Sequence, residues 1–348
     1  MIFFVVGTRP EAIKLAPLIV KFQPDERYVA WTGQHYDYTL TKAVWQHLPH
    51  FEFDSMLAIS GENEVERLAS MLPHLYDRIR RVRPEWVVVQ GDTTSALAGA
   101  IAANKAGARV WHVEAGARSF DLRQPEEHNR TVIDHLATGW GYSYPCDGEN
   151  LKHEGITGGI HTGDILIDAL YVNGDKGNVH GLGPLPPGES KHVLVTIHRS
   201  ETLADAAAVE RIASGLRWIA EHDGPVIFLR HPHTAQVMTD DMLEGVDVRE
   251  PVSPTRFRDL LRHATAFITD SGGGCVEAAY LGVPCVVART HTEYHDLQRA
   301  GLIYMGRTDP TAVDRAMATA IRAKPDRKAV ASSWMGEASL GTYRALKA

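Results

Sequence analysis

Short apolar runs alternate with longer stretches of helical periodicity along most of the chain. In the first half, the apolar runs are Ile2 to Val6, Tyr28 to Trp31, Trp86 to Gln90 and Arg109 to Val113. Between them, apolar residues recur every three or four positions, as in Glu62 to Arg81, and so predict helices, although Pro73 should kink or break that one. Strands that alternate with helices are typical of a parallel sheet, so the sequence predicts an α/β fold.

A stretch rich in Gly and Pro, residues 174–190, divides the chain into two halves with the same rhythm. After it the pattern restarts with apolar runs at Val193 to Thr196 and Val226 to Leu229. A chain of 348 residues is also long enough for two domains. We therefore expect two Rossmann-like doubly wound domains facing a cleft, at 1–173 and 191–326, joined by a linker at 174–190. A final helix over 327–348 is expected to cross back onto the first domain.

The second half contains a predicted strand, glycine turn and helix. The apolar run Ala266 to Thr269 ends at Asp270 and Ser271, three glycines follow at 272–274, and we expect a helix from Cys275 to Leu281. Glycine lets backbone amides approach a ligand closely, and the first turn of a helix presents unpaired N–H groups. The stretch is neither a GxGxxG motif nor a P-loop. It predicts either an anion site or a plain tight turn.

Polar side chains follow three of the strands predicted in the first half. Arg9 comes after the first strand, Asp92 after the third and Glu114 after the fourth. Pro10 marks the first residue of a helix, and Lys14 lies one turn further along. Because parallel sheets bind ligands at the carboxyl ends of their strands, we expect these side chains to share one edge, with Arg9 as a phosphate donor.

A charged cluster, Pro125 to Arg130, precedes another helical pattern. Glu126 and Glu127 could simply complement the positive end of the helix dipole. Alternatively, Glu126 joins Asp92 and Glu114 in one cleft, because neighbouring like charges raise a carboxyl pKa and create acid–base partners.

Composition excludes several classes of partner. The chain is 44% hydrophobic and 23% charged, carries a formal net charge of −7 and has no run of Lys or Arg. Nucleic acid and anionic membranes are therefore not expected as partners. Cys146, Cys275 and Cys285 form no CxxC pair, no apolar run reaches membrane-spanning length and no signal peptide precedes the first strand, so we expect a cytoplasmic protein.

The eighteen histidines raise the question of a metal site. His231 and His233 lie two apart and His291 and His295 four apart, but neither pair matches HExxH or has a further ligand at suitable spacing. Ser271 is not part of a GxSxG motif. We expect neither a metal site nor a Ser/His/Asp triad.

Eight motifs, which keep their order over nearly the whole chain, together resemble the non-hydrolysing bacterial UDP-N-acetylglucosamine 2-epimerases. They are GTRPEAIK (7–14), TGQH (32–35), QGDTTSALA (90–98), HVEAGAR (112–118), PEEHNR (125–130), TGDILIDAL (162–170), VTIHRSET (195–202) and TDSGGGCVEAAYLGVP (269–284). The resemblance implies a glycosyltransferase-B type fold, with UDP held mainly by the second domain. It also implies interconversion of UDP-GlcNAc and UDP-ManNAc without a cofactor or an essential metal, and a homodimer.

The resemblance also implies roles for individual residues. The catalytic residues would be Asp92, Glu114, Glu126 and His198. The substrate-binding residues would be Arg9, Lys14, Gln34, His198, Phe257, Ser271, Gly272, Gly273 and Glu277. Among these, Phe257 would stack near the uracil and Glu277 would hold the ribose hydroxyls, whereas His198 would contact the diphosphate.

The chain departs from the family pattern at several positions. The family's S-G-G-x-Q-E-E becomes SGGGCVE at 271–277, and its T-E-R-P-E becomes TEYHD at 292–296, so that Tyr294 replaces an arginine. Tyr36 and Asp37 stand where many bacterial members bind a second UDP-GlcNAc as an activator, so we do not expect that activation. The hexosamine stays open, and so do two other outcomes: a hydrolysing 2-epimerase that releases ManNAc and UDP, and a glycosyltransferase that uses a UDP-sugar.

Overall fold

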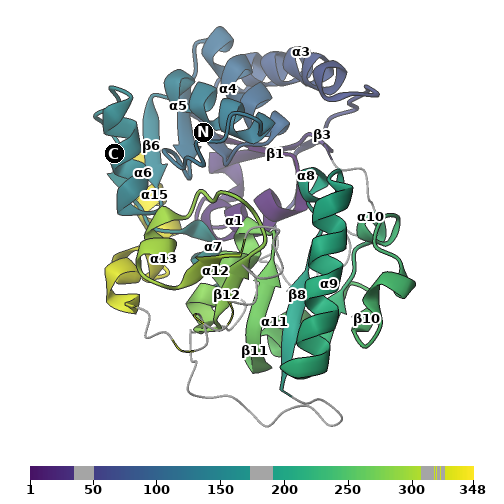
Figure 1. Cartoon of the computed structure of the whole chain (residues 1–348). Coiled ribbons are helices and arrows are strands. Elements are labelled where there is room, and N and C mark those ends of the chain that lie inside the picture. The colour runs from purple at the N-terminus through teal and green to yellow at the C-terminus, as the bar shows by residue number, and fades with distance from the viewer. Residues whose placement is uncertain (35–50, 173–190, 307–316, 318, 320–321, 323–325) are drawn as a thin grey trace. The chain divides into compact units, whose positions relative to one another are not determined.

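The computed structural model describes residues 1–34, 51–172, 191–306, 317, 319, 322 and 326–348, which fall into two compact units (Figure 1). The first unit is Met1–Lys176 with Ala331–Ala348, and the second is Gly177–Val330. Each unit has its own parallel sheet with helices between the strands. The predicted α/β class with two Rossmann-like doubly wound domains is therefore confirmed. The linker predicted at 174–190 and the pair Tyr36 and Asp37 lie outside the described residues.

The sheet of the first unit has seven parallel strands in the order β3-β2-β1-β4-β5-β6-β7. Their bounds are Ile2–Val6 (β1), Arg27–Trp31 (β2), Ser55–Met56 (β3), Trp86–Gln90 (β4), Arg109–Val113 (β5), Gly139–Tyr142 (β6) and Ile160–His161 (β7). Ile2 of β1 pairs with Arg27 on one side and with Trp86 on the other, so the strand order reverses between β1 and β4. The four strands predicted in this half are confirmed.

Helices cover both faces of this sheet, because successive side chains of a strand point to opposite faces. The helices are Arg9–Ile19 (α1), Glu64–Val82 (α3), Thr94–Ala106 (α4), Pro125–Leu136 (α5), Pro145–His153 (α6), Ile165–Val172 (α7) and Ala338–Lys347 (α15), with a short 3-10 helix at Pro24–Glu26 (η1). Phe4 and Val6 pack in one core with α1, α7 and α15. Phe3 and Val5 pack in the other with α3, α4 and α5.

Two predictions about proline concern this unit. Of the kink or break predicted at Pro73, the break does not occur, because helix α3 continues through that residue. It buries Met71, Leu75 and Ile79 completely. Burial of such side chains contributes about 1.5–3 kcal/mol each, so the three together outweigh the roughly 3 kcal/mol that an interior proline costs. Helix α1 begins one residue before Pro10, which is tolerated because none of the first four N–H groups has a partner inside the helix.

The sheet of the second unit has six parallel strands in the order β10-β9-β8-β11-β12-β13. Their bounds are His192–Thr196 (β8), Val226–Leu229 (β9), Asp247–Arg249 (β10), Ala264–Thr269 (β11), Cys285–Val287 (β12) and Ile303–Met305 (β13). The helices are Ser200–Leu203 (α8), Ala206–His222 (α9), Pro232–Ala235 (α10), Pro254–His263 (α11), Gly272–Leu281 (α12) and His295–Arg299 (α13), with a 3-10 helix at Asp240–Leu243 (η2). Helix α9 packs on one face, whereas α11 and α12 contact the strands from the other (Figure 1). The strand order here reverses between β8 and β11.

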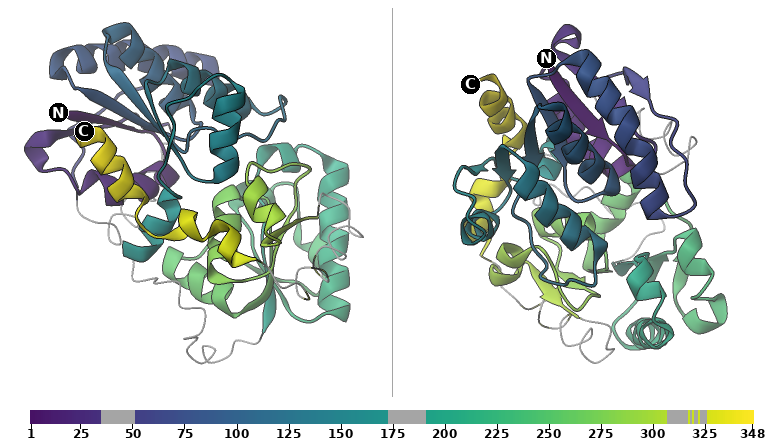
Figure 2. Two further views of the ribbon diagram at one scale, coloured as in Figure 1. Left: turned by 90° about the vertical axis from the view of Figure 1, so that its left-hand side faces the viewer. Right: turned by 90° about the horizontal axis from the view of Figure 1, so that it is seen from above.

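The C-terminal stretch is not the single helix predicted over 327–348. A 3-10 helix, Arg327–Trp334 (η3), comes first, and α15 begins only at Ala338. Gly336 between them has a φ of 69°, a left-handed conformation that ends the first helix. Helix α15 then packs beside α1 and α7, as Figure 2 shows. No helix in the described ranges is long and apolar enough to span a membrane.

The start of α15 is fixed by a buried carboxylate of α7. Asp168 accepts hydrogen bonds from the backbone N–H groups of Ala338 at 3.1 Å and Ser339 at 2.7 Å, and also from the Ser339 hydroxyl. These N–H groups belong to the first turn of α15, which has no side-chain cap of its own. Asp168 therefore supplies the cap from another helix.

Replacement of Asp168 by alanine should lower the free energy of unfolding of the first unit by about 1–3 kcal/mol, because buried donors lose their acceptor. Chemical denaturation followed by circular dichroism would measure the change. Glu337→Ala is the matched control, since Glu337 precedes the same helix, is exposed and does not cap it. Equal losses in the two variants would contradict this account.

Candidate functional site

The predicted site residues collect at the carboxyl ends of the strands that flank each reversal of strand order. In the first unit, Arg9 follows β1 and Asp92 follows β4, with Glu114 just after the neighbouring β5. In the second unit, His198 follows β8 and Ser271 follows β11. Connections leave such a point toward opposite faces of the sheet and leave a crevice for ligands between them. Each unit therefore carries its own candidate half-site.

Glu114 forms the centre of a cluster in the first unit. Its two carboxylate oxygens accept hydrogen bonds from Lys14 Nζ at 2.8 and 3.0 Å, and Oε2 also accepts one from Gln90 Nε2 at 2.7 Å. Burial acts to lower the pKa of Lys14, but Glu114 and Asp164 raise it overall and keep it an ammonium. Glu114 has a φ of 67°, unusual for a residue other than glycine, which marks a constrained position.

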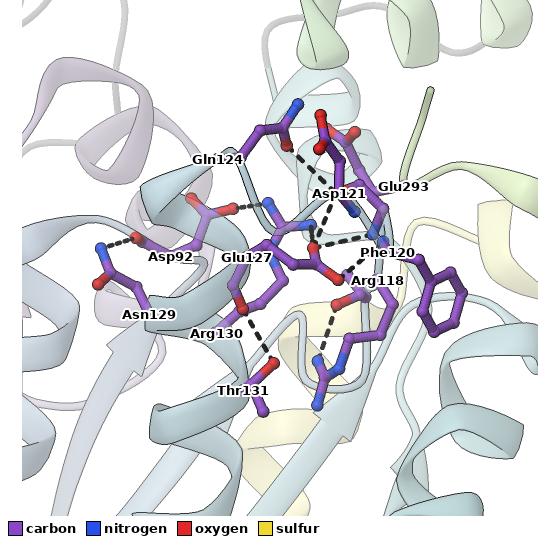
Figure 3. A network of polar contacts seen from close by, with 12 residues as sticks. Asp92, Arg118, Phe120, Asp121, Gln124, Glu127, Asn129, Arg130, Thr131 and Glu293 are labelled. Atoms are coloured by element: carbon purple, nitrogen blue, oxygen red, sulfur yellow. Dashed lines mark hydrogen bonds and ion pairs between the residues drawn. The ribbon is translucent and has the colours of Figure 1, made fainter. Parts of the chain in front are cut away.

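Asp92 is held by one turn of α5, as Figure 3 shows. Arg130 forms an ion pair with its carboxylate, and Asn129 Nδ2 donates to its backbone carbonyl at 2.9 Å. Arg130 is almost buried, whereas the Asp92 side chain stays 29% exposed. The helix therefore fixes both the backbone and the side chain of Asp92 and leaves part of the carboxylate accessible.

The two adjacent glutamates of α5 have different surroundings. Glu127 is buried and accepts hydrogen bonds from Ser119 N and Oγ, both at 2.9 Å, and from Phe120 N at 2.8 Å. It also lies 3.4 Å from Arg130. Glu126 is partly exposed, and among the described residues its carboxylate forms no hydrogen bond or ion pair. Glu127 thus holds the preceding loop, and Glu126 is the carboxylate that remains accessible.

His112 links the turn that carries Asp92 to α5. Its Nδ1 lies 2.6 Å from Asp134 Oδ1, and its Nε2 lies 2.8 Å from the carbonyl oxygen of Gly91. The side chains of His112 and Asp134 are fully buried. Burial opposes ionisation of Asp134, but His112 and Arg118 hold the pKa of Asp134 below its ordinary value. Contacts at both ring nitrogens therefore hold the ring between the turn and the helix. The sequence did not reveal this link.

The first turn of α1 positions Arg9 next to the β4 to α4 connection. Thr8 caps the helix, and the Glu11 carboxylate accepts hydrogen bonds from the N–H groups of Gly7 at 2.9 Å and Thr8 at 2.6 Å, and from Thr93 Oγ1 at 2.7 Å. Burial raises the pKa of Glu11 to about 7, even though these hydrogen bonds act to lower it. Arg9 is the first residue of the helix and is partly buried.

Gln34 lies after β2, where its amide oxygen contacts the start of α4. Ser95 donates to it from its backbone N–H at 3.0 Å and from its hydroxyl at 2.8 Å. A Cβ atom at Gly7 would lie only 1.9 Å from Ser95 Oγ, so only glycine fits there. Gln34 therefore lies among the turns that follow β1, β2 and β4.

In the second unit, Asp270 orients the loop that carries His198. Its buried carboxylate accepts hydrogen bonds from the backbone N–H of His198 at 3.1 Å and of Arg199 at 2.8 Å. The His198 ring remains 42% exposed, with Nδ1 3.7 Å from Asp270 Oδ1. Asp270 was noted in the sequence only as the end of a strand, and its role as an anchor was missed.

Three histidine rings lie near one another in this unit. The ring centroids of His198 and His231 are 6.4 Å apart, and those of His231 and His233 are 4.9 Å apart. Burial, followed by the charges of His233 and His198, lowers the pKa of His231. Over the residues that the structure describes, no group of three His, Cys, Asp or Glu side chains is arranged to hold a metal ion.

Helix α12 begins at Gly272, so the prediction of a glycine turn before a helix starting at Cys275 is wrong. Ser271 caps the helix by accepting a hydrogen bond from Gly274 N at 3.2 Å, and this cap makes the glycines the first helical turn. Gly272 and Gly273 therefore contribute N–H groups of the kind that bind anions. Glu277 follows on the same helix and is partly exposed.

Phe257 lies on α11, the helix beside α12. Its ring packs edge-on against that of Phe267, with centroids 5.8 Å apart and an interplanar angle of 71°. It is partly exposed, so one side of the ring remains accessible. The packing holds an aromatic ring near the helix that carries Ser271 and Glu277.

The protein has two Rossmann-like units. One carries a cluster of carboxylates at its switch point, and the other carries a capped helix start. These features define a two-domain α/β protein of the nucleotide-binding kind. The family model "UDP-N-acetylglucosamine 2-epimerase" matches residues 21–346. The chain belongs to this family.

Individual relatives agree with this assignment. The chain is 33% identical to the UDP-N-acetylglucosamine 2-epimerase of Methanocaldococcus jannaschii, over 85% of this chain and 86% of the relative. It is 32% identical to the UDP-2,3-diacetamido-2,3-dideoxy-D-glucuronate 2-epimerase of Pseudomonas aeruginosa, over 86% of each chain. A crystal structure of the Methanocaldococcus jannaschii UDP-GlcNAc 2-epimerase with UDP-GlcNAc and UDP aligns with a TM-score of 0.83 and 29% identity, over 95% of this chain and 97% of that one. The fold is thus the one that the resemblance implied.

The buried Glu11 should make the stability of the first unit depend on pH. Its pKa of about 7 in the folded protein lies above the ordinary value of 4.5, so its contribution to stability is present below about pH 4.5 and is lost as pH rises through about 7. At 1.36 kcal/mol per pKa unit, the free energy of unfolding should fall by about 3 kcal/mol over this range. Glu11→Gln should remove most of that slope, because its amide oxygen can still accept from Gly7 N and Thr8 N while its NH₂ group donates to Thr93 Oγ1.

Denaturation curves at several pH values would measure this effect. Glu66→Gln is the matched control, because Glu66 accepts a hydrogen bond from Glu62 N in the same way at the start of α3 but is exposed. A slope that persists in Glu11→Gln, or disappears in Glu66→Gln, would contradict the assignment.

Proposed function

We propose that this protein is a non-hydrolysing UDP-N-acetylglucosamine 2-epimerase that interconverts UDP-GlcNAc and UDP-ManNAc. The observation that carries the proposal is the cluster at the ends of β4 and β5, where Glu114 lies between Lys14 and Gln90 and Asp92 is held by Arg130. Membership of the family and the likeness to an epimerase that was crystallised with UDP-GlcNAc and UDP support the choice of substrate.

The chemistry requires the nucleotide to leave before the product forms. The proton at C2 is not adjacent to a carbonyl, so its removal depends on cleavage of the bond between C1 and oxygen. A base takes this proton, the electron pair of the C–H bond forms a double bond between C1 and C2, and UDP departs with the electrons of the C1–O bond. The intermediate is a 2-acetamidoglucal. Protonation of C2 from the opposite face and return of UDP to C1 complete an isomerisation that consumes no oxidant or reductant.

Donors aimed at the diphosphate should supply much of the rate enhancement, because negative charge develops there as the bond breaks. In the second unit, the first turn of α12 after Ser271 offers backbone N–H groups, and the exposed ring of His198 is a further donor. Arg9 in the first unit is the third candidate. Glu277 and Phe257 are proposed to hold the ribose and the uracil.

Inversion needs proton donors and acceptors on both faces of the ring, and one carboxylate cannot provide both. Asp92, Glu114 and Glu126 are proposed for these roles. All three belong to the first unit, Asp92 and Glu114 at the ends of adjacent strands and Glu126 on the helix that anchors Asp92. Lys14 holds Glu114 in place through the ion pair between them.

A second sugar is also a candidate substrate. The relative from Pseudomonas aeruginosa acts on a diacetamido glucuronate, and its sequence identity to this chain is comparable to that of the UDP-N-acetylglucosamine 2-epimerases. UDP-2,3-diacetamido-2,3-dideoxy-D-glucuronate is therefore the second substrate to try after UDP-GlcNAc. A hydrolysing variant of the same reaction would use water in place of the returning UDP.

Incubation with UDP-GlcNAc in D₂O should place deuterium at C2 as UDP-ManNAc appears, because the C2 proton exchanges with solvent at the base. NMR would follow both sugars and free UDP together. An unlabelled product would rule out the elimination mechanism. Free UDP released in step with product would instead assign the hydrolysing outcome, and turnover of the glucuronate alone would identify the second substrate.

Asp92→Asn and Glu114→Gln should each reduce kcat by about 10²–10⁴-fold with little change in UDP affinity, because each removes a proton-transfer group. Arg9→Ala should weaken both turnover and UDP binding. The control is Glu85→Gln, an exposed carboxylate paired with Arg109 at the opposite end of the same strands, which should leave kcat unchanged. Near-normal turnover in either carboxamide variant would refute its acid–base role.

A further inference from the structure

Asp134 of α5 is a fully buried carboxylate that the proposed reaction does not use. Its Oδ1 lies 2.6 Å from Nδ1 of His112, which is also fully buried. Its Oδ2 accepts a hydrogen bond from Gly116 N at 3.0 Å and lies 2.8 Å from Nη2 of Arg118. The two oxygens of one carboxylate therefore contact different segments of the first unit.

The contact through His112 reaches the turn that carries Asp92. Nε2 of the ring lies 2.8 Å from the carbonyl oxygen of Gly91, the first residue after β4. Gly91 N donates to Val113 O at 3.0 Å, so residues of β5 hold both backbone polar groups of Gly91. Asp92 is the next residue along the chain. The His112 ring, which Asp134 orients, therefore helps to fix the backbone from which Asp92 projects.

The direct contact of Asp134 reaches the turn that carries Glu114. Glu114 has a φ of 67°, and such a conformation persists at a residue other than glycine only where surrounding contacts hold it. Two residues further on, Gly116 donates its N–H to Asp134 and accepts a hydrogen bond from Asn150 Nδ2 at 2.9 Å. A Cβ atom at Gly116 would lie 2.2 Å from Asp147 O, so this turn is tightly packed. Asp134 is thus one of the groups that keep Glu114 in its constrained conformation.

The two turns lie close together. A Cβ atom at Gly91 would lie 3.7 Å from Glu114 Oε2. Helix α5, which carries Asp134, also holds Asp92 through Asn129 and Arg130. Displacement of a reacting group by about 1 Å can lower a rate about 10²-fold. A residue that contacts both turns is therefore placed to control how well the two carboxylates are aligned.

We propose that Asp134 is a positioning residue that holds the turns of Asp92 and Glu114 at a fixed spacing, the first through His112 and the second through Gly116 N. This inference rests on the proposed function, because the spacing of these two carboxylates matters for catalysis only in that reaction. Asp134 acts through the two turns and does not touch substrate. Its role depends on its hydrogen bonds and not on its negative charge.

Asp134→Ala removes both contacts at once. The kcat should fall by about 10²-fold, because both carboxylates lose a support that fixes their position. The Kd for UDP should stay close to the wild-type value, since most of the groups proposed to hold UDP belong to the second unit. Steady-state kinetics and calorimetric titration with UDP would measure the two quantities. A loss of UDP affinity as large as the loss of kcat would contradict the proposed role.

Asp134→Asn is the conservative variant that tests rescue. Its amide oxygen can accept from Gly116 N and Arg118, and its NH₂ group can donate to His112 Nδ1 while Nε2 donates to Gly91 O. Because every contact can be kept without the charge, kcat should stay close to the wild-type value. A fall equal to that of Asp134→Ala would overturn the proposal, since the negative charge would then be the required property.

Asp168→Ala is the matched control. Asp168 is also a buried carboxylate of the first unit that accepts from backbone N–H groups, but those groups belong to α15. The variant should be less stable and should keep its kcat at a temperature where all the variants are folded. An equal loss of kcat in Asp168→Ala and Asp134→Ala would overturn the proposal, because a general loss of stability would then suffice.

Amide hydrogen exchange followed by mass spectrometry tests the anchor without catalysis. Asp134→Ala should raise exchange in residues 91–95 and in residues 114–118. His112→Phe keeps a ring but loses the contact with Gly91 O, so it should raise exchange chiefly in residues 91–95 and also lower kcat. If Asp134→Ala does not fold, His112→Phe provides both measurements.

Unchanged exchange in residues 91–95 of His112→Phe, or in either segment of a folded Asp134→Ala, would overturn the shared anchor. The failure of the proposed function has a different signature. Absence of turnover of the wild-type protein on any UDP-hexosamine would refute that function, and the exchange comparison would still show whether Asp134 holds both turns.

Discussion

The reversal of strand order in each sheet is the constraint on which the rest of the structure depends. At β1 and β4, and again at β8 and β11, the connections leave toward opposite faces, and such a point leaves a crevice at the carboxyl ends of the strands. Polar side chains that follow these strands can gather at such an edge. The first unit uses it for carboxylates and a lysine, and the second for a capped helix start and a histidine. The same topology thus supports two kinds of chemistry.

Charged groups at the carboxyl edge of the first sheet carry a cost in free energy. Lys14 and Glu114 lose most of their contact with water, and an uncompensated charge in such a place costs several kcal/mol. Their ion pair and the hydrogen bond that Gln90 donates to Glu114 compensate these charges. Partial satisfaction of such a network is worse than an apolar core, so loss of one member leaves its partners unsatisfied. The free-energy cost of burying these charged groups is easier to explain at a reacting centre than in a structural core.

The sequence predicted the strands and the side chains at their ends, because buried parallel strands are apolar runs and their ends share an edge. It could not separate Glu126 from Glu127, since adjacent helical residues point about 100° apart and only the position of the Ser119 loop decides which one is buried. The link between His112 and Gly91 joins residues 21 apart through tertiary structure alone. The start of α12 was misplaced because the glycines suggested a turn, whereas the Ser271 cap makes them helical.

The departure from the family pattern at Tyr294 affects the carboxyl edge of the second sheet. A Cβ atom at Gly272 would lie 3.0 Å from the Tyr294 ring and 2.7 Å from Glu293 Oε1, so the absent side chain makes room for this segment beside the helix start. Arg289 pairs with Glu293 at 3.2 Å and offsets its charge. At position 294, an uncharged ring takes the place of the family's arginine. In the reaction proposed above, the groups of this unit assigned to the departing diphosphate are therefore the helix N–H groups and His198.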